Sequence, residues 1–171
     1  MTKVNVIRGD ITKIAASALI TAINPEGMWF GGVDKAIYRS SGDMFHDQAG
    51  AVMPLRDGQI IFAPKTGDHS GEFDSVLFVV DSLVTPIYDL MLPVFKEADK
   101  LGLRNISVPA IRTGVMAGVC EPQIEAVEGL AQVIIDIVAS NPVNLQEINV
   151  IIYDSQADLQ QLQNRLKELS A

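Results

Sequence analysis

The sequence predicts an α/β fold: a single three-layer α/β/α domain over residues 1–171, with a mostly parallel mixed sheet covered by helices on both faces. Strand-like segments alternate with segments of helical periodicity along the chain. The segments 17–23 and 75–80 are apolar almost throughout, which is typical of strands buried on both faces in a parallel sheet. A chain of 171 residues is long enough for one sizeable core, and no linker, repeat or low-complexity segment divides it.

The first two predicted strands both end at polar residues. Residues 4–7 form a strand that ends before Asp10, and residues 17–23 form a strand that ends at Asn24. Pro25 stops the second strand, because proline cannot donate to a ladder and keeps the preceding residue away from helical dihedrals. We therefore expect the carboxylate of Asp10 at a strand end, where it can accept a hydrogen bond from a ligand.

The glycine turn after Asn24 is the centre of the predicted site. Gly31 and Gly32 allow a tight turn or the close approach of a ligand, and residues 33–42 follow as an amphipathic helix. The unpaired amides and partial positive charge of a helix N-terminus form a natural anion site. An ordinary strand-to-helix connection is the alternative, but the polar residues Asn24 and Asp34 on either side of the turn favour a ligand site.

The rest of the chain alternates in the same way. The remaining strands are predicted at 59–63, 75–80, 106–108 and 148–153, and the remaining helices at 87–101, 122–138 and 155–169. Pro93 either places the start of its helix near Asp89 or kinks that helix. Ser155 and Asp158 form a capping box at the start of the last helix. His46 is interpreted as a packing or surface residue.

Composition excludes several classes of partner and site. Thirteen Lys and Arg residues against 21 Asp and Glu give a net charge of −8, which argues against binding to nucleic acid. The single cysteine, Cys120, excludes an internal disulfide, and the two histidines are too few for a Cys/His zinc site. With no hydrophobic signal core and no run of membrane-spanning length, we expect a cytoplasmic protein without metal, cofactor or membrane partner.

Polar or glycine-rich features follow most of the predicted strands. They are Asp10, Asn24, the Gly31-Gly32 turn, the loop 109–118 and Tyr153. Ligands of parallel sheets bind beyond the carboxyl ends of the strands. We therefore expect these features to converge at one edge of the sheet.

Four segments together resemble the macrodomain family. They are GDITK (9–13), ITAIN (20–24), GGVDKAIYRSSG (31–42) and VPAIRTGVMAG (108–118). Macrodomains are α/β modules that bind ADP-ribose, and some of them hydrolyse ADP-ribosyl bonds or related phosphate esters. The resemblance covers nearly the whole chain in order, and the combination of GDIT with a GGVD helix is fairly specific.

The resemblance implies roles for residues at the predicted edge. Asp10 accepts a hydrogen bond from the adenine amino group, Ile11 offers its backbone N–H, and Tyr153 stacks on the adenine ring. Asn24 contacts the distal ribose and, with Asp34, forms the candidate catalytic pair, with water activated either by Asp34 or by the phosphate of the ligand itself. The first phosphate loop comprises Gly31, Gly32 and Val33, and the second comprises Arg112, Thr113, Gly114, Val115, Met116 and Ala117.

The sequence also departs from the family pattern. Thr21 and Ile23 replace the usual residues before Asn24, and Arg112, Met116, Ala117 and Gly118 change the second phosphate loop. Arg112 either grips a phosphate as a bidentate donor or fills the cleft. Trp29, which precedes the glycine turn with Phe30, is a lid over the ligand, a plug of the cleft or a ring packed against a neighbouring loop.

Three functions are consistent with these observations. The first is hydrolysis of an ADP-ribosylated protein or of a small derivative such as ADP-ribose-1″-phosphate. The second is non-catalytic binding of ADP-ribose or another nucleotide, and the third is a degenerate module used as an interaction surface. The absence of G-x-G-x-x-G and G-K-[ST] sequences argues against other nucleotide-binding folds.

Overall fold

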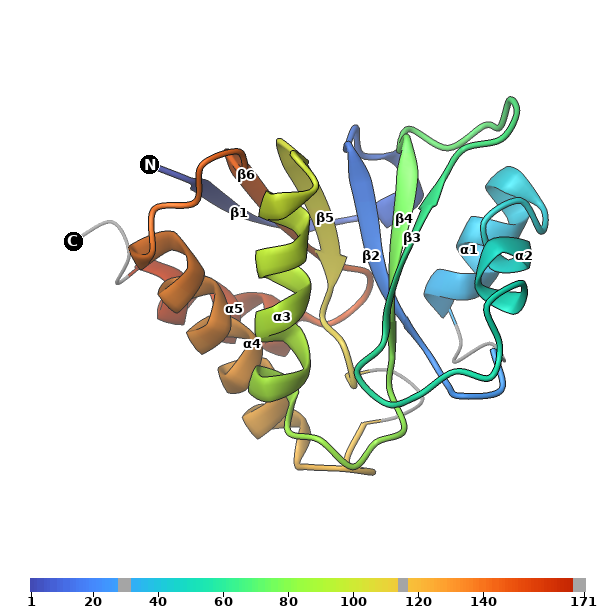
Figure 1. The fold of residues 1–171 in the computed structure, drawn as a ribbon. Helices are drawn as coiled ribbons and strands as arrows, with labels where there is room; N and C mark the ends of the chain where they lie inside the picture. The colour runs from blue at the N-terminus through green and yellow to red at the C-terminus, as the bar shows by residue number, and fades with distance from the viewer. Residues whose placement is uncertain (28–31, 114–116, 168–171) are drawn as a thin grey trace.

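A computed structural model of the chain describes residues 1–27, 32–113 and 117–167 and shows the expected alternation of strands and helices (Figure 1). In chain order the elements are β1 (Lys3–Arg8), the 3-10 helix η1 (Ile11–Lys13), β2 (Ala18–Ile23), α1 (Gly32–Ser41), α2 (His46–Gly50), β3 (Ile60–Pro64), β4 (Ser75–Val80), α3 (Ile87–Lys100), β5 (Asn105–Pro109), α4 (Gln123–Ala139), β6 (Glu147–Ile152) and α5 (Gln156–Leu166). The short helix α2 lies where the sequence predicted no element. Pro93 lies inside α3, which begins at Ile87.

The six strands form one sheet in the order β1-β6-β5-β2-β4-β3. All neighbouring strands are parallel except β3, which runs antiparallel to β4. The carboxyl ends of the five parallel strands therefore share one edge of the sheet. The two central strands β2 and β5 pair only at Ala18 with Ile106 and at Leu19 with Ser107, so their ladder stops well before either strand ends.

Helices cover both faces of the sheet, which gives the predicted three layers. Helices α3, α4 and α5 lie on one face, and α1 and α2 lie on the other (Figure 1). The strand β4 explains the need for both layers: its residues Leu77 and Val79 join the core under α3 and α4, whereas Phe78 and Val80 join the core under α1 and α2. A strand with both faces buried has no polar alternation, which is why residues 75–80 are apolar throughout.

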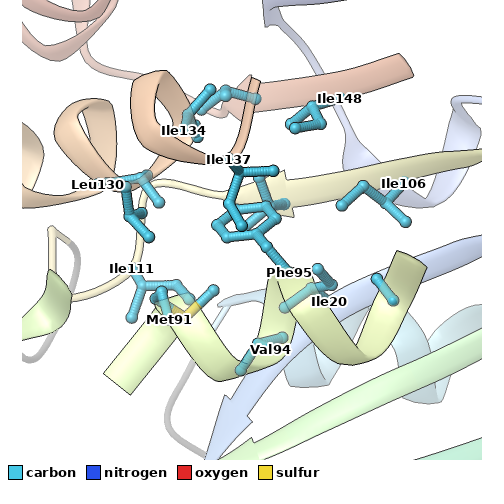
Figure 2. Close-up of a cluster of buried hydrophobic side chains, with 14 of the residues drawn as sticks. Ile20, Met91, Val94, Phe95, Ile106, Ile111, Leu130, Ile134, Ile137 and Ile148 are labelled. Carbon is cyan, nitrogen blue, oxygen red and sulfur yellow. The ribbon is translucent and has the colours of Figure 1, made fainter. Parts of the chain in front are cut away.

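Phe95 of α3 lies at the centre of the larger core (Figure 2). Its side chain is fully buried, and Ile20 of β2, Ile106 of β5 and Ile137 of α4 belong to the same cluster. The contacts join two strands and two helices that are distant in the sequence. Removing the ring would therefore leave a cavity shared by several elements.

The smaller core lies under α1 and α2. Ile37 of α1 and Ala49 of α2 are buried there, and Phe45 packs against Phe73 with ring centroids 5.4 Å apart. The ring of His46 contacts the edge of Phe78 at a centroid distance of 5.0 Å, consistent with a packing role. Within the described ranges, no helix is both long and apolar enough to cross a membrane.

We expect Phe95→Ala to lower the free energy of unfolding by about 3–5 kcal/mol, because it removes a fully buried ring and leaves a cavity. Phe62→Ala is the matched control, since Phe62 lies on the edge strand β3 and is 39% exposed. Phe62→Ala should lower the free energy of unfolding by about 1 kcal/mol or less. Urea denaturation followed by circular dichroism measures both, and equal losses would contradict the central position of Phe95.

Candidate functional site

A cavity of about 560 Å³ lies at the carboxyl edge of the sheet. The ends of β1 and β6, the helix η1, the loop after β5 and one side of α1 contribute its walls. Its lining residues are Gly9, Asp10, Ile11, Gly32, Val33, Lys35, Ala36, Arg39, Pro109, Ala110, Thr113, Ile151, Ile152, Tyr153, Asp154, Ser155 and Asp158. This volume lies within the range of about 300–1,000 Å³ that is common for small-molecule sites.

The cavity brings together six of the residues that the sequence singled out. They are Asp10, Ile11, Gly32, Val33, Thr113 and Tyr153. Of the other predicted residues that the structure describes, Asn24, Asp34, Arg112 and Ala117 are not part of its lining. Trp29, Phe30, Gly31, Gly114, Val115 and Met116 lie outside the described residues.

Asp10 caps η1 at the mouth of the cavity. Its Oδ1 accepts hydrogen bonds from the backbone N–H of Thr12 at 2.9 Å and from Thr12 Oγ1 at 2.7 Å. Asp10 itself has extended dihedrals, as expected for an N-cap residue. These bonds fix the orientation of the carboxylate while it lines the cavity, so its second oxygen can accept from a ligand.

Tyr153 forms the rim of the cavity just after β6. The residue is 80% exposed although it lines the cavity, so one face of its ring is available for a planar ligand. The segment after it turns into α5, where Ser155 Oγ accepts from the backbone N–H of Asp158 at 3.2 Å. The carboxylate of Asp158 in turn accepts from Gln123 Nε2 at 3.0 Å, which links the starts of α4 and α5.

One side of α1 forms a wall of the cavity and presents two basic residues to it. Lys35 and Arg39, one helical turn apart, line the cavity with Val33 and Ala36, while Ile37 is buried in the core on the other side of the helix. Neither cation was among the site residues predicted from the sequence. Their i,i+4 spacing opposite the apolar stripe was the available signal.

Arg112 lies in a buried ion-pair network. Its Nε donates to Asp81 Oδ2 at 3.0 Å and its Nη2 to Asp81 Oδ1 at 2.7 Å, a bidentate pair. Nη1 donates to Glu121 Oε1 at 2.8 Å, and Nη2 also donates to the carbonyl of Thr85 at 2.7 Å. Burial by itself would lower the pKa of the Arg112 guanidinium, but Asp81, followed by Glu121, raises that pKa above its ordinary value.

This network gives the Arg112 side chain a role that neither predicted alternative includes. Both predicted alternatives, a grip on a ligand phosphate and a plug of the cleft, need the guanidinium in the cavity. Instead, the side chain ties the loop after β5 to the loop after β4 and to the start of α4 through Asp81, Thr85 and Glu121. The backbone of Arg112 has a positive φ of 64°, an uncommon conformation that this network supports.

Asp34, in the first turn of α1, is buried and is not part of the cavity lining. It is 2% exposed, and its Oδ1 lies 3.3 Å from Nε2 of His46, the first residue of α2. This pair links α1 to α2. A general base must lie within reach of the water that it activates. The position of Asp34 beside the glycine turn in the sequence favours such a role, but its placement in the structure supports that role less.

Asn24 shapes the turn after β2. Its Oδ1 accepts from the backbone N–H of Glu26 at 3.1 Å, and its carbonyl accepts from the N–H of Gly27 at 2.9 Å. Gly27 has a φ of 71°, which glycine adopts without strain. Among the described residues, no group of three or more His, Cys, Asp or Glu side chains is arranged to hold a metal ion.

Comparisons with curated proteins find relatives along almost the whole chain. It is 28% identical over 169 residues to a macro domain-containing protein of Streptomyces nogalater, which covers 92% of this chain and 88% of that protein. It is 29% identical over 168 residues to O-acetyl-ADP-ribose deacetylase 1 of Pantoea vagans, which covers 91% and 94% of the two chains. No family model matches the chain.

Solved structures show the same fold. The Oceanobacillus iheyensis macrodomain with ADP matches with a TM-score of 0.73 and 26% identity, covering 96% of this chain and 90% of that one. The Trypanosoma brucei macrodomain in complex with ADP-ribose matches with a TM-score of 0.77 at 19% identity, covering 98% and 69%. These findings confirm the predicted macrodomain resemblance and the fold.

The Arg112 network predicts that alanine substitutions at two arginines differ greatly in their effect on the free energy of unfolding. Arg112→Ala should lower the free energy of unfolding by about 3–5 kcal/mol, because it leaves the buried carboxylate of Asp81 uncompensated. Arg8→Ala is the control: Arg8 pairs with Asp154 at 3.1 Å, but the two side chains are 51% and 79% exposed. Arg8→Ala should lower the free energy of unfolding by about 1 kcal/mol or less. Similar losses for both variants in urea denaturation would refute the structural role of Arg112.

Proposed function

We propose that this chain, which has the macrodomain fold, binds ADP-ribose or an ADP-ribosyl derivative in the cavity at the carboxyl edge of its sheet. The observation that carries the proposal is the composition of that cavity. A carboxylate acceptor, an exposed aromatic ring and the amino end of a helix surround a space of about 560 Å³. These three features suit an adenine amino group, an adenine ring and a diphosphate respectively.

The adenine would lie between Asp10 and Tyr153. The second oxygen of Asp10 accepts from the amino group, and the Tyr153 ring stacks on the base at the rim. The diphosphate would lie at the amino end of α1, beside Gly32. A Cβ added at Gly32 would meet no atom of the other described residues within 4 Å, which leaves room for a phosphate beside the backbone there.

The relatives support the same ligand class. O-acetyl-ADP-ribose deacetylase 1 is similar over almost its whole length, and the two solved macrodomains hold ADP and ADP-ribose. The net charge of −8 opposes an anionic ligand at long range. Local backbone amides and the α1 terminus must therefore provide the attraction.

Asp10→Asn tests the adenine contact. The amide keeps an oxygen that can cap η1 through Thr12, but its nitrogen cannot accept from the adenine amino group. We expect ADP-ribose affinity to fall by about 1–3 kcal/mol, which is roughly 5- to 150-fold, with little change in melting temperature. Isothermal titration calorimetry measures the affinity of wild type and variant.

Asp68→Asn is the charge-matched control for this experiment, because Asp68 lies exposed in the loop after β3. Its affinity for ADP-ribose should equal that of the wild type. Equal affinities for wild type and Asp10→Asn would exclude the proposed adenine contact. A wild-type protein that gives no heat with ADP-ribose would leave only the interaction-module alternative.

Hydrolysis of a small ADP-ribosyl ester is the second candidate function, and the 29% identity to an O-acetyl-ADP-ribose deacetylase favours it. The carboxylate of Asp34 lies outside the cavity lining, paired with His46. Activation of water by the phosphate of the ligand itself agrees better with this arrangement. Asn24 would then act by orienting the distal ribose beside the phosphates.

The two predicted catalytic residues should therefore differ in their effects on O-acetyl-ADP-ribose turnover. Asn24→Ala should lower the rate about 100-fold through misplacement of the ribose. Asp34→Asn should keep the rate within about threefold of wild type, since a lost general base would cost about 100- to 10,000-fold. A loss of that larger size in a variant with an unchanged melting temperature would identify Asp34 as the base.

A further inference from the structure

We propose that Lys35 and Arg39 form a second anion subsite, which recognises a phosphate carried by the adenosine ribose of the ligand. The proposal rests on the proposed binding of ADP-ribose in the same cavity. It adds a specificity that the diphosphate and adenine contacts do not provide. The favoured ligand would be ADP-ribose with a 2′-phosphate.

The two cations are placed to act together. Both line the cavity, both are exposed, and the helix separates them by about 6 Å along its axis. Among the residues that the structure describes, neither has an ion-pair partner. Two side chains of this length and spacing can converge on one phosphate.

Four other basic side chains among the described residues are engaged with carboxylates. Such pairs join Arg8 to Asp154, Lys65 to Asp74, Arg112 to Asp81 and to Glu121, and Arg165 to Glu128. What sets Lys35 and Arg39 apart from the other basic residues without an ion pair is that they line the cavity, where they place two positive charges one helical turn apart in a protein with a net charge of −8. A site of that kind favours an anion from the ligand rather than from the protein.

The position of the cations along α1 identifies the part of the ligand that they face. The backbone N–H of Ser70 donates to Ser40 at 2.9 Å, and that of Glu72 donates to Thr12 at 2.8 Å. One short segment thus binds both the carboxyl half of α1 and η1, the helix capped by Asp10. Arg39 precedes Ser40 directly, so it lies toward the adenosine end of the cavity.

The amino end of α1 marks the opposite end of the ligand. Gly32, beside which the diphosphate would lie, is about 10 Å from Arg39 along the helix axis. Contacts with the diphosphate alone would therefore leave Arg39 unused. An additional phosphate on the adenosine ribose spans this separation.

The part of the lining that follows β6 does not offer an equivalent site. Asp154 and Asp158 lie there, the first paired with Arg8 at 3.1 Å and the second accepting from Gln123 at 3.0 Å. Their negative charge directs an anion toward Lys35 and Arg39. Arginine near the adenosine ribose is also how dinucleotide-binding folds accommodate a 2′-phosphate, through paired N–H donors.

The experiment compares ADP-ribose with ADP-ribose 2′-phosphate by calorimetric titration of the full chain. The wild type should bind the 2′-phosphate form about tenfold more tightly at low salt, a difference of about 1.4 kcal/mol. That preference should shrink at about 0.5 M salt, because exposed charges are then screened. The double variant Lys35→Gln/Arg39→Gln should bind both ligands equally, with an affinity for ADP-ribose within about threefold of wild type.

Lys13→Gln is the matched control, since Lys13 is an exposed cation of η1 outside the cavity lining. It should retain the full preference for the 2′-phosphate. Equal affinities of the wild type for both ligands would overturn the proposal, as would a preference that survives in the double variant or disappears in Lys13→Gln. Failure of the wild type to bind either ligand would refute the proposed function itself, and the subsite with it.

Discussion

The parallel arrangement of five strands is the constraint on which the rest of this structure depends. Parallel strands need crossover connections, and here those connections bring helices to both faces of the sheet. The same arrangement gathers the carboxyl ends of the strands at one edge, where the connecting loops meet. Since β2 and β5 stop pairing early, the loops that follow them are free to take separate directions. The cavity lies at this edge for a topological reason before any particular side chain is considered.

An acidic protein that binds an anion must concentrate its attraction locally. The helix terminus at Gly32 offers backbone amides that no titration removes, and Lys35 and Arg39 extend the attraction along the same wall. By contrast, Arg112 is held away from the cavity in an ion pair with Asp81. The distribution of charge therefore matters more to this site than the net charge of the chain.

The buried polar residues show how the site is held in shape. Arg112 joins the loops after β4 and β5, and Asp34 joins α1 to α2 through His46. Each of these residues lies close in sequence to residues that line the cavity. They support the loop and the helix that form its walls, and burying their charges is tolerated because each has a partner. Residues that line the cavity and residues that support its walls are thus neighbours in the chain. The side chains of the first group face the cavity, and those of the second contact other parts of the protein.

The sequence by itself determined the fold class, the positions of the strands and most helices, and the location of a site at their carboxyl ends. Apolar runs such as 75–80, the stop at Pro25 and the cap at Ser155 are local signals with local causes. The tertiary structure alone decided which side chains face the cavity. The side chain of Arg112 forms an ion pair with Asp81, which lies 31 positions earlier in the chain, and the side chain of Asp34 contacts His46. Lys35 and Arg39 are cavity residues because the fold brings one side of α1 to the same cavity as η1 and the end of β6. Such orientations depend on segments that are distant in the sequence.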